Sequence, residues 1–122
     1  MKLAQARSHI PGKMNRTEQR YSLLLQELVQ RKIVAHWGFE ALKLKLADRT
    51  FYTPDFMVLL CDGGIEFHEV KATWKAAHQD DSRVKIKVAA QDHQWARFTS
   101  YEMNTSHREW FGPHGAALWS RK

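Results

Sequence analysis

The sequence has little of what secreted or membrane-spanning proteins need. Cys61 is the single cysteine, so no disulfide can form within the chain, and nothing points to an oxidising compartment. No run of residues approaches the roughly 20 apolar positions that span a bilayer, and the first residues lack the apolar stretch of a signal peptide. We therefore expect a cytoplasmic protein without a membrane partner.

Acidic residues are scarce in the N-terminal part of the chain. Residues 1–50 contain four Asp or Glu against ten Lys or Arg, whereas residues 51–122 contain nine of each. The formal net charge of +6 favours anionic partners, nucleic acid first. A generally basic soluble surface is the alternative, but the uneven distribution favours an N-terminal part that faces DNA.

Internal repeats and low-complexity segments are absent from the sequence, and its 122 residues suit one compact domain. The 43% hydrophobic content, with five Trp and six Phe, can supply a real core. Residues 1–13 contain the Pro11-Gly12 turn signal and are expected to form a flexible basic arm. That arm either follows DNA phosphates or is simply a disordered terminus. Residues 14–122 are expected to form the single domain.

The clearest helix is expected over residues 15–32. Asn15 followed by Glu18 is typical of a capping box. Glu18 lies three residues before Tyr21 and therefore falls on the apolar stripe, where a carboxylate needs a partner, a capping role or a metal ion. The stripe repeats at helical spacing and consists of Tyr21, Leu24, Leu25, Leu28 and Val29.

Apolar and alternating runs predict a series of strands between residues 33 and 71, with a turn at residues 47–50. Pro54 interrupts one of the apolar runs. Asp62-Gly63-Gly64 is a strong hairpin signal, and this hairpin brings the strand that begins near Asp55 beside the strand that ends near Lys71. The expected strands cover residues 33–40, 42–46, 51–60 and 65–71.

The rest of the chain predicts one helix and one further strand. Residues 72–82 are polar and are expected to form a loop. Residues 83–91 alternate Val and Ile with Lys as a strand would, yet the spacing also fits a helix and Ala89-Ala90 favour one, so we expect a helix. Residues 97–103 are expected to form a final short strand, followed by a tail rich in aromatic and turn residues.

The residues with the most distinctive chemistry are Asp55, Glu69 and Lys71. Glu69 and Lys71 are two apart on a strand, so their side chains emerge on the same face, and Asp55 begins the neighbouring strand. Two carboxylates suit a hard cation such as Mg²⁺, which stabilises charge on a phosphate and activates a bound water. Lys71 could orient that water, assist its deprotonation or stabilise the phosphorus, and its role stays open. A solvated cross-strand ion pair is the alternative interpretation of Glu69 and Lys71.

This layout resembles the PD-(D/E)xK nuclease superfamily, in particular its small phage and prophage endonuclease-like proteins related to Holliday junction resolvases. The resemblance covers roughly residues 14–103 and implies an α/β fold with a restriction-endonuclease-like αβββαβ core, a mixed central sheet flanked by helices. The strings that carry it are Leu46-Ala47-Asp48-Arg49-Thr50, Tyr52-Thr53-Pro54-Asp55-Phe56, Glu66-Phe67-His68-Glu69-Val70-Lys71 and Arg83-Val84-Lys85-Ile86-Lys87-Val88-Ala89-Ala90.

The resemblance implies a metal-dependent DNA endonuclease with Mg²⁺ or Mn²⁺ as its cofactor. Asp55 and Glu69 would be metal ligands, the Val70 backbone carbonyl a further ligand, and Lys71 the catalytic lysine. Glu18 matches an acidic residue that several members place on the first helix, which makes it a further catalytic and metal-binding candidate. The alternative is a non-catalytic DNA-binding module, or a subunit of a larger nuclease or transposition complex.

The same resemblance carries expectations about substrate and setting. Hydrolysis would leave a 5′-phosphate and a 3′-hydroxyl on branched or otherwise structured DNA, in phage recombination, repair or packaging. Resolvase relatives act as symmetric dimers, so a homodimer is expected. The chain would be encoded by a phage or prophage and would work in the cytoplasm of a bacterial host cell.

Six residues are candidates for DNA contact through the phosphates or beside the site. Gln91 matches a glutamine that follows the motif in some branches of the superfamily. For the basic residues the alternatives are a lysine-guarded edge strand and the solvated face of a helix. The candidates are Lys43, Lys45, Arg49, Lys85, Lys87 and Gln91.

The seven histidines do not form a zinc motif, because no pair has a recognised ligand spacing and the single cysteine excludes a zinc finger. His68 alternates away from the strand face that carries Glu69. We interpret it as a structural or a surface residue.

Overall fold

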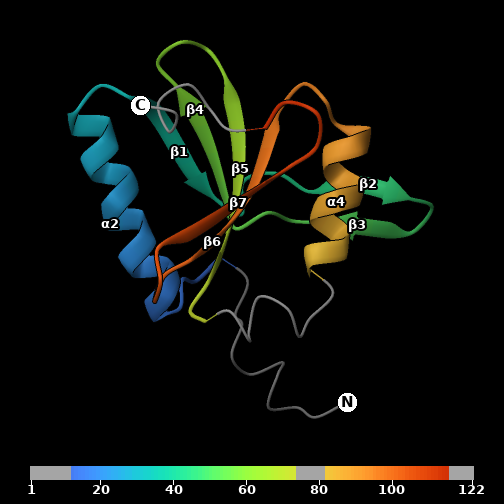
Figure 1. The fold of residues 1–122 in the computed structure, drawn as a ribbon, viewed down its shortest axis with the longest axis horizontal. Helices are drawn as coiled ribbons and strands as arrows, with labels where there is room; N and C mark the ends of the chain where they lie inside the picture. The colour runs from blue at the N-terminus through green and yellow to red at the C-terminus, as the bar shows by residue number, and fades with distance from the viewer. Residues whose placement is uncertain (1–11, 74–81, 116–122) are drawn as a thin grey trace.

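A computed structural model describes residues 12–73 and 82–115. At its centre lies a five-stranded mixed sheet with one helix packed on each face, and a separate two-stranded hairpin lies beside the second helix (Figure 1). The α/β class with a mixed sheet between helices is therefore confirmed. The expected basic arm over residues 1–13 and the expected loop over residues 72–82 lie mostly outside the described residues.

The central sheet has the strand order β1-β4-β5-β6-β7. Strands β5 and β6 are parallel, with α4 as the crossover that a parallel pair requires, and the other neighbouring pairs are antiparallel. The elements are α2 (Arg16–Gln30), β1 (Val34–Phe39), β2 (Leu44–Ala47), β3 (Thr50–Tyr52), β4 (Phe56–Leu60), β5 (Ile65–Lys71), α4 (Ser82–Asp92), β6 (Arg97–Glu102) and β7 (His107–Phe111).

Helix α2 begins with the predicted capping box. The Glu18 N–H donates to Asn15 Oδ1 over 2.8 Å, and the Asn15 N–H donates to Glu18 Oε1 over 2.9 Å. The helix ends at Gln30, two residues earlier than expected, because the chain turns at Arg31 and Lys32 takes a positive φ of 61°. Its apolar stripe packs on one face of the sheet, where three of its side chains are buried: Tyr21, Leu25 and Leu28.

The hairpin between β4 and β5 forms as predicted and fixes the register of the two strands. Asp62 Oδ1 accepts the Gly64 N–H over 2.8 Å, and Gly63 takes a φ of 94° that other residues rarely adopt. The resulting register pairs Phe56 with His68. The residue before Phe56 is Asp55, so the hairpin brings this carboxylate to the end of β5.

One strand prediction is wrong, and one strand was not predicted. The run over residues 51–60 is not one interrupted strand, since Pro54 separates β3 from β4 and the two belong to different sheets. The tail after residue 103 is more than turns, because residues 107–111 form β7 at the edge of the central sheet. Its two apolar residues are adjacent and therefore point to opposite faces of the sheet: Trp110 packs on the α2 side, and Phe111 pairs with Phe98 on the α4 side.

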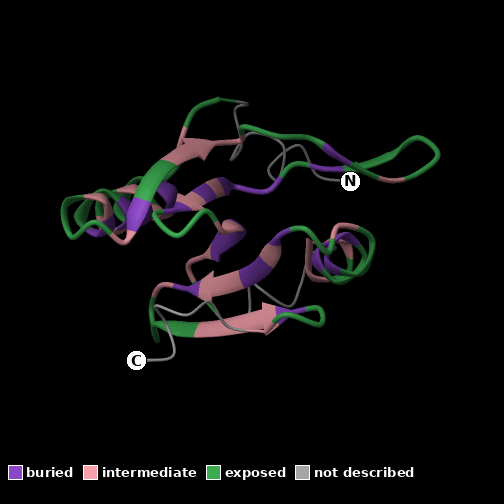
Figure 2. Ribbon diagram, turned by 90° about the horizontal axis from the view of Figure 1, so that it is seen from above, coloured by how far each residue is buried: buried purple, intermediate pink, exposed green. Residues whose placement is uncertain are grey.

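The two faces of the sheet carry separate cores. On the α2 face lie side chains such as Phe56, Val58 and Val70, and on the α4 face lie Phe67 and Phe98. Figure 2 shows this burial along the strands and on the inner sides of the helices. Helix α4 was the ambiguous segment, and its helical form is confirmed. Within residues 12–73 and 82–115, no helix is long and apolar enough to cross a membrane.

Candidate active site

Asp55, Glu69 and Lys71 come together at one end of the central sheet. Asp55 precedes β4, and its Oδ2 accepts the main-chain N–H of Val70 over 2.9 Å. Glu69 and Lys71 end β5, with Lys71 Nζ 3.6 Å from Glu69 Oε2. The Tyr52 hydroxyl, carried by the β2–β3 hairpin, donates to Glu69 Oε1 over 2.7 Å. The hydrogen bonds from Val70 and Tyr52 therefore fix both carboxylates.

The carboxylates of this cluster repel one another in a buried setting. Burial raises the pKa of Asp55 well above its ordinary value, and the negative charges of Glu69 and Glu18 raise it further. The Val70 hydrogen bond and the Lys71 ammonium lower that pKa without reversing the direction. Among the described residues, the cluster thus brings the carboxyl groups of Glu18, Asp55 and Glu69 near the Lys71 ammonium, and a bound cation would relieve the repulsion between them.

Glu18 serves the helix cap and also acts on Asp55. Its Oε1 accepts the Asn15 N–H, so the capping role is one of the three that the sequence allowed. The side chain is buried, and its charge contributes to the raised pKa of Asp55. The structure therefore places Glu18 within electrostatic reach of the other carboxylates, while one of its oxygens is engaged by the helix.

The ligand set for a metal ion is small. No group of three or more His, Cys, Asp or Glu residues is arranged to hold a metal within the part of the chain that the structure describes. A cation here would bind the carboxylates of Asp55 and Glu69, with water and the Val70 carbonyl completing its shell. Mg²⁺ suits such a site because it prefers oxygen ligands and keeps several waters. The excess negative charge fits this chemistry.

The six candidate DNA contacts lie on two neighbouring elements. Lys43, Lys45 and Arg49 are exposed on or beside the β2–β3 hairpin, which packs on α4. Lys43 falls just outside β2, with its ammonium 4.6 Å from the centre of the Phe51 ring. On α4, Lys87 and Gln91 are exposed and Lys85 is half-buried.

Gln91 is not brought to the carboxylates. Helix α4 returns the chain from the end of β5 to the start of β6, so its last turn lies toward the β4–β5 hairpin and away from Lys71 (Figure 1). The start of β6, which follows α4, lies next to the β4–β5 turn, because Arg97 Nη1 would be 3.5 Å from a Cβ atom added at Gly64. Lys85, nearer the start of α4, lies closer to the site end of the sheet.

His68 belongs to a buried polar network that the sequence did not reveal. Its Nδ1 lies 2.6 Å from the Tyr21 hydroxyl and its Nε2 lies 2.8 Å from Glu66 Oε1. Arg108 Nη2 donates to the same hydroxyl over 2.7 Å. Burial is the main cause that lowers the pKa of His68, and a neutral ring protonated on Nε2 satisfies both bonds. The structural interpretation of His68 is right and the surface one is wrong.

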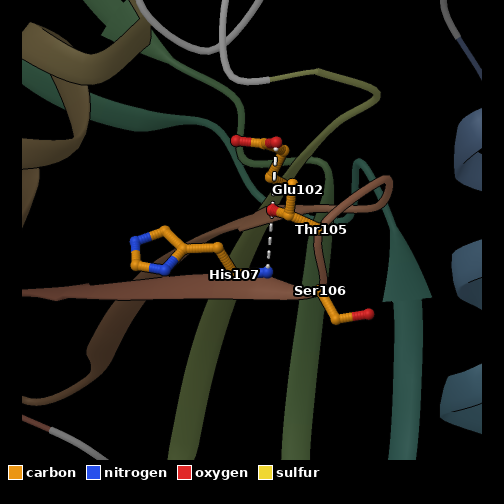
Figure 3. A pocket seen from close by; sticks show the side chains of 4 residues that line it. All are labelled: Glu102, Thr105, Ser106 and His107. Atoms are coloured by element: carbon orange, nitrogen blue, oxygen red, sulfur yellow. Dashed lines mark hydrogen bonds between the residues drawn. The ribbon is translucent and has the colours of Figure 1, made fainter.

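Tyr52 and Glu102 were also not identified from the sequence. Tyr52 stands three residues before Asp55, but nothing in the string shows that its strand folds across β5. Glu102 ends β6 directly beside Lys71 in the parallel register. It lines a pocket of about 560 Å³ together with Thr105 and Ser106 of the β6–β7 turn and His107 at the start of β7 (Figure 3). The signal available in the sequence was an acidic residue at the end of a predicted strand.

Comparison with known proteins adds no assignment. No family model matches the chain, and neither a curated protein nor a solved structure matches it.

Proposed function

We propose that this chain is a metal-dependent DNA endonuclease, with Asp55 and Glu69 as ligands of Mg²⁺ or Mn²⁺ and Lys71 as the catalytic lysine. One observation carries the proposal: Asp55, whose pKa is raised by burial and by the charge of Glu69, lies with Glu69 and Lys71 at one end of the sheet. Such crowding is unfavourable without a cation and is typical of functional sites.

The order of elements supports the same proposal. Helix α2, strands β1, β4 and β5, helix α4 and strand β6 follow one another as in the αβββαβ core that the PD-(D/E)xK resemblance implies. The β2–β3 hairpin and β7 are additions to that core. The hairpin supplies Tyr52 to Glu69, so one addition contributes directly to the site.

Each residue has a task that its contacts fit. When bound, the cation would stabilise charge on the scissile phosphate and supply an activated water. Val70 orients Asp55 through its N–H, and Tyr52 orients Glu69 through its hydroxyl. The Lys71 side chain is 22% exposed, so its ammonium can donate to a phosphate oxygen or to the attacking water.

DNA is the partner that charge and size favour. The net charge of +6 and the basic residues of the β2–β3 hairpin and α4 suit a phosphate backbone. Lys43, Lys45, Arg49, Lys85, Lys87 and Gln91 remain the proposed contacts. Contacts to the phosphate backbone suit recognition by shape, so we propose branched or otherwise structured DNA as substrate and a homodimer as the active form.

The test is nicking of supercoiled plasmid and of four-way-junction DNA in Mg²⁺ or Mn²⁺. We expect Asp55→Ala and Lys71→Ala to lower the rate by about 10²–10⁴-fold, the range for groups that act in the transition state. Asp92→Ala makes the same change at an exposed residue of α4 and should leave the rate unchanged. Wild-type rates in both site variants would show that the assigned site is wrong.

A non-catalytic DNA-binding module is the second candidate. The small ligand set favours it, since no group of three or more His, Cys, Asp or Glu among the described residues is arranged to hold a metal. It predicts that the wild-type chain binds junction DNA yet does not nick it at any metal concentration. Nicking that appears only with a partner extract would instead indicate a subunit of a larger nuclease or transposition complex.

A further inference from the structure

Three side chains stand in a row across the end of the sheet. Lys71 of β5 is the register partner of Glu102 of β6, and Glu102 is the register partner of His107 of β7. Register partners project from the same face, roughly 5 Å apart, and Glu69 projects from that face as well. The long, flexible side chain of Lys71 can therefore bring its ammonium group to either of two carboxylates. Glu69 lies along its own strand and Glu102 lies across the strand pair.

Glu102 is held so that one of its oxygens has no hydrogen bond. The Thr105 hydroxyl donates to Oε1 over 3.0 Å, and the His107 N–H donates to that hydroxyl over 3.3 Å (Figure 3). Oε2 is buried and makes no hydrogen bond to any described residue, and the whole side chain is only 5% exposed. A buried carboxylate oxygen without a donor is unfavourable. This oxygen therefore lacks a donor that a nearby ammonium could supply.

The two carboxylate oxygens of Glu69 would have three partners once a cation binds: Tyr52, Lys71 and the cation. Its Oε1 already accepts the Tyr52 hydroxyl. Its Oε2 is the oxygen near the Lys71 ammonium, and it is also the oxygen that a cation between Asp55 and Glu69 would take. A cation bound to that oxygen would repel the nearby ammonium. Cation binding therefore favours movement of Lys71 away from Glu69 Oε2.

We propose that Glu102 receives the Lys71 ammonium when a divalent cation binds Asp55 and Glu69. The ammonium lies 3.6 Å from Glu69 Oε2 in this structure and moves across the strand pair to Glu102 Oε2. Glu102 is then a positioning residue, because it acts through Lys71 and holds the ammonium beside the cation. This exchange presupposes the cation site of the proposed function.

The test is Mn²⁺ binding to the full chain without DNA, followed by electron paramagnetic resonance of free Mn²⁺. We expect Glu102→Gln to weaken binding about three- to tenfold, the effect of one ion pair, because Lys71 then stays on Glu69 and competes with the cation. In a Lys71→Met background the same Glu102→Gln change should have little effect. A double-mutant cycle of this kind isolates the part that passes through Lys71.

Two variants separate this exchange from a simple loss of negative charge. Glu109→Gln removes a carboxylate from the same face, in the row of Glu69, but one that Arg83 already engages over 2.7 Å, so it should change Mn²⁺ binding little. Thr105→Val keeps the charge of Glu102 and releases its orientation, so it should weaken binding by less than Glu102→Gln. Thr105 is exposed, so we expect Thr105→Val to fold, and it replaces Glu102→Gln in the test if Glu102→Gln does not fold.

The outcomes are distinct. Weakening that disappears in the Lys71→Met background supports the exchange. Equal weakening in both backgrounds, or none in either, overturns it while leaving the cation site intact. If the wild-type chain binds no Mn²⁺ at all, both the exchange and the proposed function are overturned.

Discussion

At the scale of single residues, the candidate site gathers charged side chains that lower the stability of the fold. Asp55 is the sharpest case, because burial, Glu69 and Glu18 all disfavour its ionised form. A folded-state pKa above the unfolded value means that the fold loses stability as the pH rises from the unfolded pKa through the folded pKa. A buried carboxyl group that disfavours folding in this way is better explained by a functional role than by a structural one.

We predict that Asp55→Asn stabilises the fold at pH 7 while abolishing nicking. The neutral amide keeps an oxygen for the Val70 N–H and removes the repulsion, so the free energy of unfolding at pH 7 should rise. Urea unfolding measures the gain, which should shrink as the pH falls below the folded pKa of Asp55. A loss of stability at pH 7 would contradict this account of the charge cluster.

His68 gives a second prediction at this scale, with the opposite sign. Its pKa is lowered by burial, so the unfolded chain takes up a proton near pH 6.5 that the folded chain refuses. Stability should therefore fall as the pH drops through 6.5. Nitrogen NMR should show the ring neutral and protonated on Nε2 at pH 6. A charged ring at that pH would rule out the network with Tyr21 and Glu66 as drawn.

Sequence reasoning at this scale found the residues whose spacing follows the period of a strand. Glu69 and Lys71 were predicted to share a face because they are two apart, and the hairpin was predicted to bring Asp55 to them. Tyr52 and Glu102 were not found, because their contacts depend on how a side hairpin folds over β5 and on the parallel register of β6. Neither is encoded in local spacing.

At the scale of elements, the β4–β5 hairpin decides the geometry of the site. Its register sets where Asp55 stands relative to β5. Strands β4 and β5 were predictable because an Asp-Gly-Gly turn separates two runs of strand-forming residues. Strand β7 was not, because an edge strand with three polar residues followed by Trp110 and Phe111 gives no alternating signal. Similarly, the division of residues 51–60 between two sheets at Pro54 depends on tertiary contacts, so local spacing did not predict it.

We predict that Gly63→Ala destabilises the fold by about 1–2 kcal/mol. A side chain at this position would meet no atom within 4 Å, so the cost comes from the φ of 94° alone. Thermal unfolding measures it, with Cys61→Ala as the control at a neighbouring exposed residue. An unchanged unfolding temperature would show that the turn relaxes and does not hold the register.

At the scale of the whole molecule, the five basic residues proposed to contact DNA lie on or beside the elements that flank the α4 face of the sheet. The β2–β3 hairpin and α4 pack on each other, and both adjoin the face from which Glu69, Lys71 and Glu102 project. DNA that reaches the carboxylates from this side would pass these two elements. The charge asymmetry in the sequence indicated only part of this arrangement, since Lys85 and Lys87 belong to the balanced second part of the chain.

We predict that junction DNA binds this face mainly through its phosphates. Affinity measured by fluorescence anisotropy in EDTA should fall steeply with salt, and Lys45→Ala and Lys87→Ala should each lower the salt slope by roughly 1. Arg20→Ala, on an exposed position of α2, should leave the slope unchanged. An equal effect from Arg20→Ala would place the DNA elsewhere on the molecule.

The central claim is that Asp55 and Glu69 hold a divalent cation beside Lys71. A crystal of the wild-type chain soaked in Mn²⁺ and measured for anomalous scattering tests it most directly. The claim predicts one strong anomalous peak within bonding distance of both carboxylates, absent from crystals of Asp55→Asn. No peak between the two carboxylates at saturating Mn²⁺, in crystals where the site is open to solvent, would contradict it.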